Sequence, residues 1–355
     1  MNATRAFVAD AVAALHDEAA RAADTPLLAL PLAPYPGVTL YFKDESAHPS
    51  GSLKHRLARS LFLYALCNGR LAPGQRVVDA SSGSTAISQA WFARLLGCPF
   101  TAVMPACTSP DKVARVRRLG GDVELVADPG AVVDVARTYA GAGACHLDQF
   151  GLAERATDWR ANNNIAESIF AQLECEQHPV PTWIVVGAGT GGTSATLGRY
   201  LRYRRHPTWL CVVDPENSVF TPAYEAGDGS VTSDAGSRIE GIGRPRVEPS
   251  FVPNVIDRMV RIPDVTSLAA MRVLSRQLGR KVGGSTGTNF FALCLLASRM
   301  RADGLMGSLV SLICDSGERY GHTYYNDGWI AAQGFDLSSG EAALEAFLGS
   351  GEPLL

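Results

Sequence analysis

Hydrophobic positions along the chain follow two alternating patterns. Short runs rich in β-branched residues, such as 182–187, are separated by stretches with helical character, such as 52–69. Short apolar runs that glycine bounds favour buried strands, and the longer periodic stretches favour the helices that cover them. This alternation predicts parallel sheets with helices on both faces.

The same reading assigns most of the chain. The predicted strands, some with the loop that follows, lie at 38–46, 76–83, 99–106, 122–129, 182–192, 209–218 and 308–320. The predicted helices lie at 1–24, 52–69, 84–97, 109–121, 193–205, 267–279 and 288–304. The stretch 215–250, rich in Gly, Pro and Ser, is predicted to be a long loop. We therefore expect an α/β fold of two lobes, with twisted, mostly parallel sheets that helices flank.

Composition excludes several classes of function. A chain of 355 residues is long enough for two hydrophobic cores, and a net charge of −3 provides no basic field for nucleic acid. No uninterrupted apolar run of about 18 residues occurs, so we expect no membrane span. The N-terminal stretch is acidic and mixes polar with apolar residues, unlike a signal peptide. We expect a cytoplasmic protein without nucleic acid or membrane partners.

Cysteine and histidine spacing predicts neither disulfides nor metal. The eight cysteines include no CxxC pair, which favours reduced thiols in a reducing compartment. The seven histidines show no HExxH or similar ligand spacing. We therefore predict no metal site.

Four loops rich in glycine or serine follow predicted strands: 50–54, 80–86, 187–194 and 314–320. In open parallel sheets, ligands bind beyond the carboxyl ends of the strands. The four loops together therefore predict a binding region, although each has a plain reading as well. The 80–86 loop fits a carboxylate or a simple serine cap, and the hydroxyl of Ser316 fits a heterocyclic nitrogen or an ordinary turn.

The loop at 187–194, GAGTGGTS, has the form of a phosphate cradle, because its N–H groups and the following helix start attract anions. It is not a P-loop, since no GK[ST] follows. A dinucleotide fingerprint fits at Gly187, Gly189 and Gly192, with Asp214 as the acidic partner, but this signal is weak. A tight turn without a ligand is the remaining alternative.

Lys54 follows the Ser-Gly-Ser turn at 50–52, and it is one of only four lysines. Burial disfavours an ammonium, so a buried Lys54 would have a lowered pKa and would be a nucleophile for a carbonyl. The alternative is a solvated lysine at the start of a helix.

In combination these stretches resemble, in order and over nearly the whole chain, the cysteine synthase and cystathionine β-synthase family. Those are pyridoxal phosphate enzymes of fold type II, with a tryptophan synthase β-like fold. The resemblance places the Schiff-base lysine at Lys54 within GSLK, and it places the pyridine-nitrogen serine at Ser316. The cofactor-binding residues that it implies are Lys54, Ser84, Gly189, Thr190, Gly191, Gly192, Thr193 and Ser316. The substrate-binding residues that it implies are Ser81, Ser82, Gly83, Thr85, Gln149 and Gly241.

The resemblance implies that Lys54 takes the α-proton of an amino-acid substrate and that a neutral Ser316 favours β-elimination. The nearest resemblance is to bacterial members that degrade L-cysteine to sulfide, pyruvate and ammonia. Two departures argue against an ordinary O-acetylserine sulfhydrylase: Ser84 stands where asparagine is usual, and Ala86 where glycine is usual. The tail after Tyr320 is also longer than that of a typical synthase.

Three other functions stay open at this point. A β-replacement synthase would make cysteine or a related β-substituted alanine from O-acetylserine or O-phosphoserine. A nicotinamide-dependent dehydrogenase would rest on the GAGTGG loop alone. A non-catalytic relative would serve as a binding partner.

The resemblance also predicts organisation. It implies a large cofactor-binding domain of residues 1–50 and 155–355, a smaller, mobile, substrate-closing domain of residues 51–154, and a homodimer. Val8, Val12, Leu15 and Ala19 share one face of the N-terminal helix. That face suits either a subunit contact or packing within its own subunit.

Overall fold

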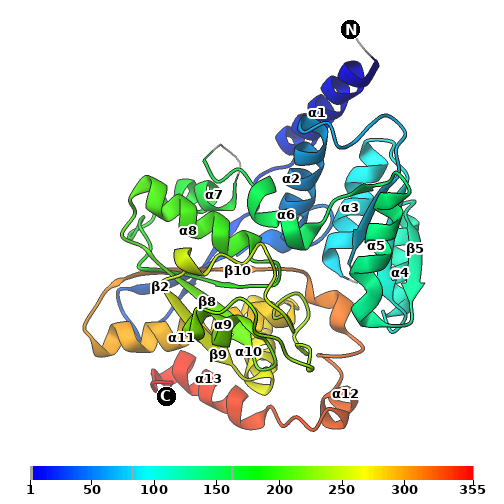
Figure 1. Ribbon diagram of the computed structural model, residues 1–355. Coiled ribbons are helices and arrows are strands. Elements are labelled where there is room, and N and C mark those ends of the chain that lie inside the picture. Colours follow the sequence, from blue (N-terminus) through cyan, green and yellow to red (C-terminus); the bar gives the residue numbers. More distant parts are fainter. Residues whose placement is uncertain (1–2, 82, 161–163, 355) are drawn as a thin grey trace. The chain divides into compact units, whose positions relative to one another are not determined.

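The computed structural model describes residues 3–81, 83–160 and 164–354, and the chain forms two compact units (Figure 1). Unit 1 comprises Met1–Asp24 and His48–Asp158, and unit 2 comprises Thr25–Ala47 and Trp159–Leu355. Each unit has a sheet of its own.

Unit 1 contains a four-stranded sheet in the order β5-β4-β3-β6, in which every neighbouring pair is parallel. Its strands are β3 (Val77–Ala80), β4 (Phe100–Pro105), β5 (Asp122–Val126) and β6 (Cys145–His146). Its helices are α1 (Ala3–Arg21), α2 (Lys54–Cys67), α3 (Ser84–Leu95), α4 (Pro110–Arg118), α5 (Val132–Gly141) and α6 (Gln149–Ala156). Phe62, Phe92 and Phe100 are fully or almost fully buried in its core.

Unit 2 contains a six-stranded sheet in the order β1-β2-β10-β7-β8-β9, in which β1 alone runs antiparallel to its neighbour. Its strands are β1 (Leu27–Pro31), β2 (Val38–Asp44), β7 (Trp183–Gly187), β8 (Trp209–Pro215), β9 (Arg258–Ile262) and β10 (Gly307–Ile313). Its α-helices are α7 (Ile165–Leu173), α8 (Gly192–Arg204), α9 (Phe220–Ala226), α10 (Asp264–Leu278), α11 (Gly284–Ala302), α12 (Asp327–Ala332) and α13 (Ser338–Ser350).

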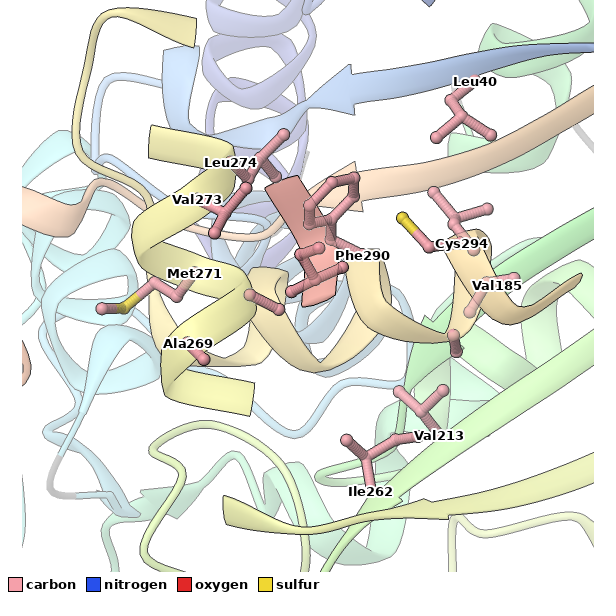
Figure 2. Close-up of a cluster of buried hydrophobic side chains, with 14 of the residues drawn as sticks. Leu40, Val185, Val213, Ile262, Ala269, Met271, Val273, Leu274, Phe290 and Cys294 are labelled. Carbon is pink, nitrogen blue, oxygen red and sulfur yellow. The ribbon is translucent and has the colours of Figure 1, made fainter. Parts of the chain in front are cut away.

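The core of unit 2 forms where α11 packs on the sheet and α10 packs on α11. Figure 2 shows Phe290 of α11 near Leu274 of α10, and Cys294 of α11 on the other side of Phe290, next to Val185 of β7, with Val213 of β8 in the same cluster. All five of these side chains are fully buried. This core supports the strands whose carboxyl ends carry the candidate site.

The predicted α/β fold with mostly parallel sheets is confirmed. The prediction of a continuous loop at 215–250 is wrong in part, because α9 forms within it. The helix forms there because Phe220 and Ala223 find buried positions, which a stretch read only for its glycines and prolines does not reveal.

The N-terminal helix belongs to the smaller unit, although the sequence placed residues 1–50 with the larger domain. Leu15 and Ala11 are buried in the core of unit 1, and Val8 and Val12 pack against the same cluster. The apolar face of α1 is therefore used within its own chain, where it covers α2. Packing within its own subunit, one of the two readings that the sequence left open for this face, is confirmed, and Val8 and Val12 stay half-buried.

Candidate active site

Lys54 is the first residue of α2, directly after the turn that the Ser-Gly-Ser sequence forms. Gly51 has a φ of +75°, a conformation that glycine adopts without strain, and its N–H donates to the carbonyl of His48 at 2.7 Å. The Lys54 N–H donates to Ser52 Oγ at 3.3 Å, and the lysine is partly buried. The turn therefore fixes where the amine-bearing side chain leaves the backbone.

A chain of buried polar groups lies beside this turn. Ser50 Oγ lies 2.8 Å from Ser88 Oγ of α3 and 3.1 Å from His55 Nδ1. His55 Nε2 lies 2.9 Å from Oε1 of Glu18 on α1. The other carboxylate oxygen of Glu18 pairs with Arg59 at 2.8 Å. Sequence reasoning missed His55 and Glu18, and the only local signal was a histidine next to the lysine. The network links the turn before Lys54 to both α1 and α3.

Burial sets the charges in this network. Burial lowers the pKa of His55, because removal from water disfavours the imidazolium more than the Glu18 hydrogen bond favours it. Burial by itself raises the pKa of Glu18, but the hydrogen bond from His55 and the positive charge of Arg59 bring it below its ordinary value. The pair therefore consists of a neutral imidazole and an ionised carboxylate.

The predicted substrate loop lies at the carboxyl end of β3. Ser81 Oγ accepts hydrogen bonds from the N–H groups of Gly83, at 3.4 Å, and Ala86, at 3.2 Å. Ser84 begins α3, and Thr85 is buried in its first turn. Ser82 lies outside the described residues. The Ser81 hydroxyl thus organises the start of α3, where N–H groups without helical acceptors favour an anion such as a carboxylate.

Gln149, the first residue of α6, is brought beside this loop. Its Nε2 donates to the Ala80 carbonyl at 2.7 Å, and its backbone N–H donates to Asp79 at 3.3 Å. Asp79 is buried in β3 and also lies 3.3 Å from His146 Nε2. Sequence reasoning missed Asp79, whose carboxylate holds the start of α6 against the end of β3.

The predicted phosphate loop, Gly189–Thr193, connects β7 to α8 in unit 2. Gly191 has a φ of +90°, and a Cβ atom there would lie 2.6 Å from Phe251 Cα. A Cβ on Gly189 would overlap the carbonyl oxygen of Gly241. Thr190 Oγ1 accepts from the Gly192 N–H at 3.2 Å. Only glycine fits these two positions, and the N-terminus of α8 gives the loop a positive dipole end that suits phosphate.

Gly241 lies next to this phosphate loop, as its contact with Gly189 requires. Gly241 and Gly243 have φ values of +91° and +73°, and the Gly243 N–H donates to the Ala188 carbonyl at 2.8 Å. The structure therefore brings the glycine-rich stretch at 239–243 together with the phosphate loop.

Ser316 follows β10, which runs parallel to β7, so its loop and the phosphate loop leave the same edge of the sheet. Ser316 Oγ accepts from the Glu318 N–H at 3.4 Å, as the cap of a short 3-10 turn, Gly317–Tyr320. Because the oxygen acts as an acceptor, the hydroxyl proton can be donated to an acceptor such as a ring nitrogen.

Asp214, the proposed ribose ligand of a dinucleotide site, has a different role. Its carboxylate is fully buried and accepts from the backbone N–H of Thr221 at 2.8 Å and from its hydroxyl at 3.0 Å. Burial raises the pKa of Asp214. The residue anchors α9, and this use removes the support for the dinucleotide reading.

The residues of unit 2 fit a phosphorylated pyridine. Neighbouring backbone occupies the space that side chains of Gly189 and Gly191 would need, and the N–H groups of this loop suit a phosphate. A neutral hydroxyl at the same edge of the sheet suits the ring nitrogen. Within residues 3–81, 83–160 and 164–354, no cluster of three or more His, Cys, Asp or Glu side chains is arranged to hold a metal. No helix in that part of the chain is long and apolar enough to cross a membrane.

Comparisons with known proteins agree with this chemistry. The profile of the family described as "Pyridoxal-phosphate dependent enzyme" matches residues 20–315. The L-cysteine desulfhydrase Cds1 of Mycobacterium tuberculosis is 56% identical over 349 residues, covering 97% of this chain and 95% of that protein. A putative cysteine synthase of Sinorhizobium fredii is 30% identical, covering 86% and 89%.

A solved structure of O-ureido-L-serine synthase superposes with a TM-score of 0.71 at 27% identity, covering 87% of this chain and 96% of that one. The family profile spans most of the chain, and its matched range contains the GSLK turn and the glycine loop described above. The chain therefore belongs to the family of pyridoxal-phosphate dependent enzymes.

Proposed function

We propose that this protein is an L-cysteine desulfhydrase, which converts L-cysteine and water to sulfide, pyruvate and ammonia. The observation that carries the proposal is the 56% identity, over 97% of this chain, to a relative named as an L-cysteine desulfhydrase. The presence of Lys54 at the start of α2, in the GSLK turn, supports it.

Lys54 has two roles in this proposal: its amine would hold the cofactor at its aldehyde, and it would then accept the α-proton of cysteine. When bound, pyridoxal phosphate supplies an electron sink for negative charge at the α-carbon. The N–H groups of Gly189–Thr193 would hold the phosphate, and the Ser316 hydroxyl would donate to the ring nitrogen without charging it. Ser84 completes the cofactor contacts.

The substrate carboxylate binds at the start of α3 in this proposal. Hydroxyl and N–H donors come from Ser81, Ser82, Gly83 and Thr85. Gln149 supports this loop. Gly241, in the glycine-rich stretch at 239–243, contacts the substrate. The support is the N-terminus of α3, where the Ala86 N–H donates to Ser81 Oγ, and the bond from Gln149 Nε2 to the Ala80 carbonyl. Unit 1 is proposed to be mobile and to close over the substrate.

The experiment is an assay of the purified, cofactor-loaded enzyme with L-cysteine alone. We expect equimolar sulfide and pyruvate, and a yellow protein whose visible absorbance is lost in Lys54→Ala. Lys112→Ala, which changes a half-buried lysine of α4 in unit 1, outside these loops, serves as the matched control and keeps both colour and activity. Borohydride reduction followed by peptide mapping locates the modified lysine, and an unmodified Lys54 with active protein would refute the proposal.

A β-replacement synthase is the second candidate, because the Sinorhizobium relative and the structural neighbour are both named as synthases. It predicts product only when O-acetylserine or O-phosphoserine is supplied with a second nucleophile. Sulfide release from cysteine alone, at a rate above that of synthesis, decides for the desulfhydrase.

We also propose a homodimer in the cytoplasm. The dimer follows the family resemblance, and the location is supported by eight cysteines that are all free thiols in the structure. A mass equal to one chain in solution would contradict the dimer.

A further inference from the structure

The C-terminal tail after Tyr320 lies beyond the family profile, which ends at residue 315. The match to the Mycobacterium desulfhydrase covers 97% of this chain and so includes most of the tail. Within unit 2, α13 packs on α10, and Leu344 and Phe347 are fully buried. The tail is thus an integral part of this unit, and its first turns carry the adjacent tyrosines Tyr324 and Tyr325.

The Tyr324 hydroxyl forms hydrogen bonds with the backbone of one segment, residues 238–240. It accepts from the Glu240 N–H at 2.9 Å and donates to the Arg238 carbonyl at 2.7 Å. The ring stacks on Tyr320, with centroids 4.9 Å apart, and the side chain is 2% exposed. Burial, together with the nearby charge of Glu240, raises the pKa of Tyr324 well above its ordinary value. The hydroxyl is therefore protonated and able to donate.

The segment that Tyr324 holds leads directly to Gly241 and Gly243. Both glycines have positive φ angles, and glycine loses more conformational freedom on ordering than any other residue. At its far end the segment is tied to the phosphate loop by the bond from the Gly243 N–H to Ala188. Tyr324 thus fixes the near end of a glycine-rich segment whose far end touches the cofactor-binding loop.

Tyr325 holds a different segment in the same way. Its hydroxyl accepts from the Val282 N–H at 2.9 Å and donates to the Val282 carbonyl at 2.7 Å. Val282 forms a β-bridge with Ser316. Two neighbouring tyrosines of the tail therefore hold two separate parts of the candidate site.

We propose that Tyr324 is a positioning residue, which orders residues 238–243 so that Gly241 meets the amino-acid substrate. This inference rests on the proposed function, in which Gly241 contacts cysteine. A positioning role differs from a purely structural one because it changes substrate binding more than overall stability.

The test compares Tyr324→Phe with two matched variants. Tyr41→Phe removes a hydroxyl that donates to Glu176 at 2.7 Å, also from a buried tyrosine of unit 2. Tyr325→Phe removes the neighbouring hydroxyl. Hydrogen exchange is measured on the cofactor-free proteins, and KM and kcat for cysteine are measured on the loaded enzymes.

Loss of two net hydrogen bonds predicts roughly ten- to a hundredfold faster exchange at residues 240–243 in Tyr324→Phe. We expect its KM for cysteine to rise roughly fivefold or more, while kcat changes less than about twofold. Tyr41→Phe and Tyr325→Phe leave exchange at 240–243 at the wild-type rate.

Three outcomes would overturn the inference: wild-type exchange at 240–243 in Tyr324→Phe, faster exchange with an unchanged KM, or an equal rise of KM in Tyr41→Phe. If the loaded wild-type enzyme releases no sulfide from cysteine, the proposed function fails instead. The exchange measurement needs neither cofactor nor substrate, so it still decides whether Tyr324 orders the segment.

Discussion

At the scale of single residues, the polar network beside Lys54 determines a protonation state. An ionised Glu18 requires a donor, so the neutral imidazole of His55 carries its proton on Nε2. Nδ1 is then an acceptor, and the Ser50 hydroxyl donates to it. The charged or titratable groups that face His55 are Glu18 from α1, Arg59 from its own helix, and His48, whose ring stacks on it at 4.8 Å. The turn before Lys54 is therefore sensitive to protonation of one histidine.

This network predicts a loss of stability in mild acid. The pKa of His55 is lower in the folded protein than its ordinary value of 6.5, so the unfolded chain binds the proton first as pH falls. The contribution of His55 to the free energy of unfolding is fully present above pH 6.5. It is lost as the pH falls towards the lower pKa that His55 has in the folded protein. The pKa of Glu18 is also lowered, from 4.5, and adds a loss of the same sign at lower pH. His55→Gln should flatten the upper part of this profile, measured as thermal midpoint against pH.

His16→Gln, which changes an exposed histidine of α1, is the control and should run parallel to wild type. A His55→Gln profile that also runs parallel to wild type between pH 7.5 and pH 5.5 would show that His55 does not titrate between the two states.

At the scale of elements, the phosphate loop depends on close approach of backbone segments. The backbone at 241–242 fills the space where a side chain of Gly189 would stand, and the backbone at 250–251 fills the space where a side chain of Gly191 would stand. The strand β7, the loop and the start of α8 are local in sequence, but the two segments that pack against them come from residues 50 or more positions later. The loop keeps its shape because glycine allows these neighbours to come close.

Gly191→Ala tests this requirement. A positive φ costs a non-glycine residue about 1–3 kcal/mol, and overlap with residues 250–251 adds to that cost. We expect a lower thermal midpoint and at least about tenfold weaker binding of pyridoxal phosphate, measured by absorbance titration. Gly229→Ala, in the same unit and with open space at its Cβ position, is the control and should resemble wild type. Equal cofactor affinity in the two variants would refute the role given to Gly191.

At the scale of the whole molecule, the candidate site residues are distributed over the two units. Lys54, Ser81–Thr85 and Gln149 belong to unit 1, whereas Gly189–Thr193, Gly241 and Ser316 belong to unit 2. Unit 2 also carries the tail whose tyrosines hold the 238–240 and 282 segments. The apolar face of α1 packs within unit 1, where Leu15 is buried and Val8 and Val12 are half-buried.

We propose that the homodimer uses other surfaces than the α1 face, because that face packs within unit 1. We expect light scattering to give twice the mass of one chain, unchanged by Val8→Ser at the edge of that face. If Val8→Ser stays folded but dissociates to single chains, the subunit contact lies on α1 and this prediction is wrong.

The turns and loops that carry the candidate residues were predictable because their signals are local. Lys54 follows a tight turn at the start of a helix, and Gly189–Thr193 and Ser316 lie directly after strands; in each place a few consecutive residues determine the backbone. The supporting residues were not predictable, because their partners are distant in sequence. Glu18 and His55 are 37 residues apart, and Tyr324 and Arg238 are 86 residues apart. No periodicity or motif connects such positions.

By itself, the sequence determined the alternation of strands and helices, the glycine loop, the lysine turn and, through their order, the family. These features depend on backbone preferences and hydrophobic periodicity, which act over neighbouring residues. Only the tertiary structure decided that α1 packs with the smaller unit, that Asp214 anchors a helix, and that tyrosines of the tail hold the glycine-rich segment. Those outcomes depend on which buried polar groups find partners when distant segments pack together, and that choice is made by the folded chain as a whole.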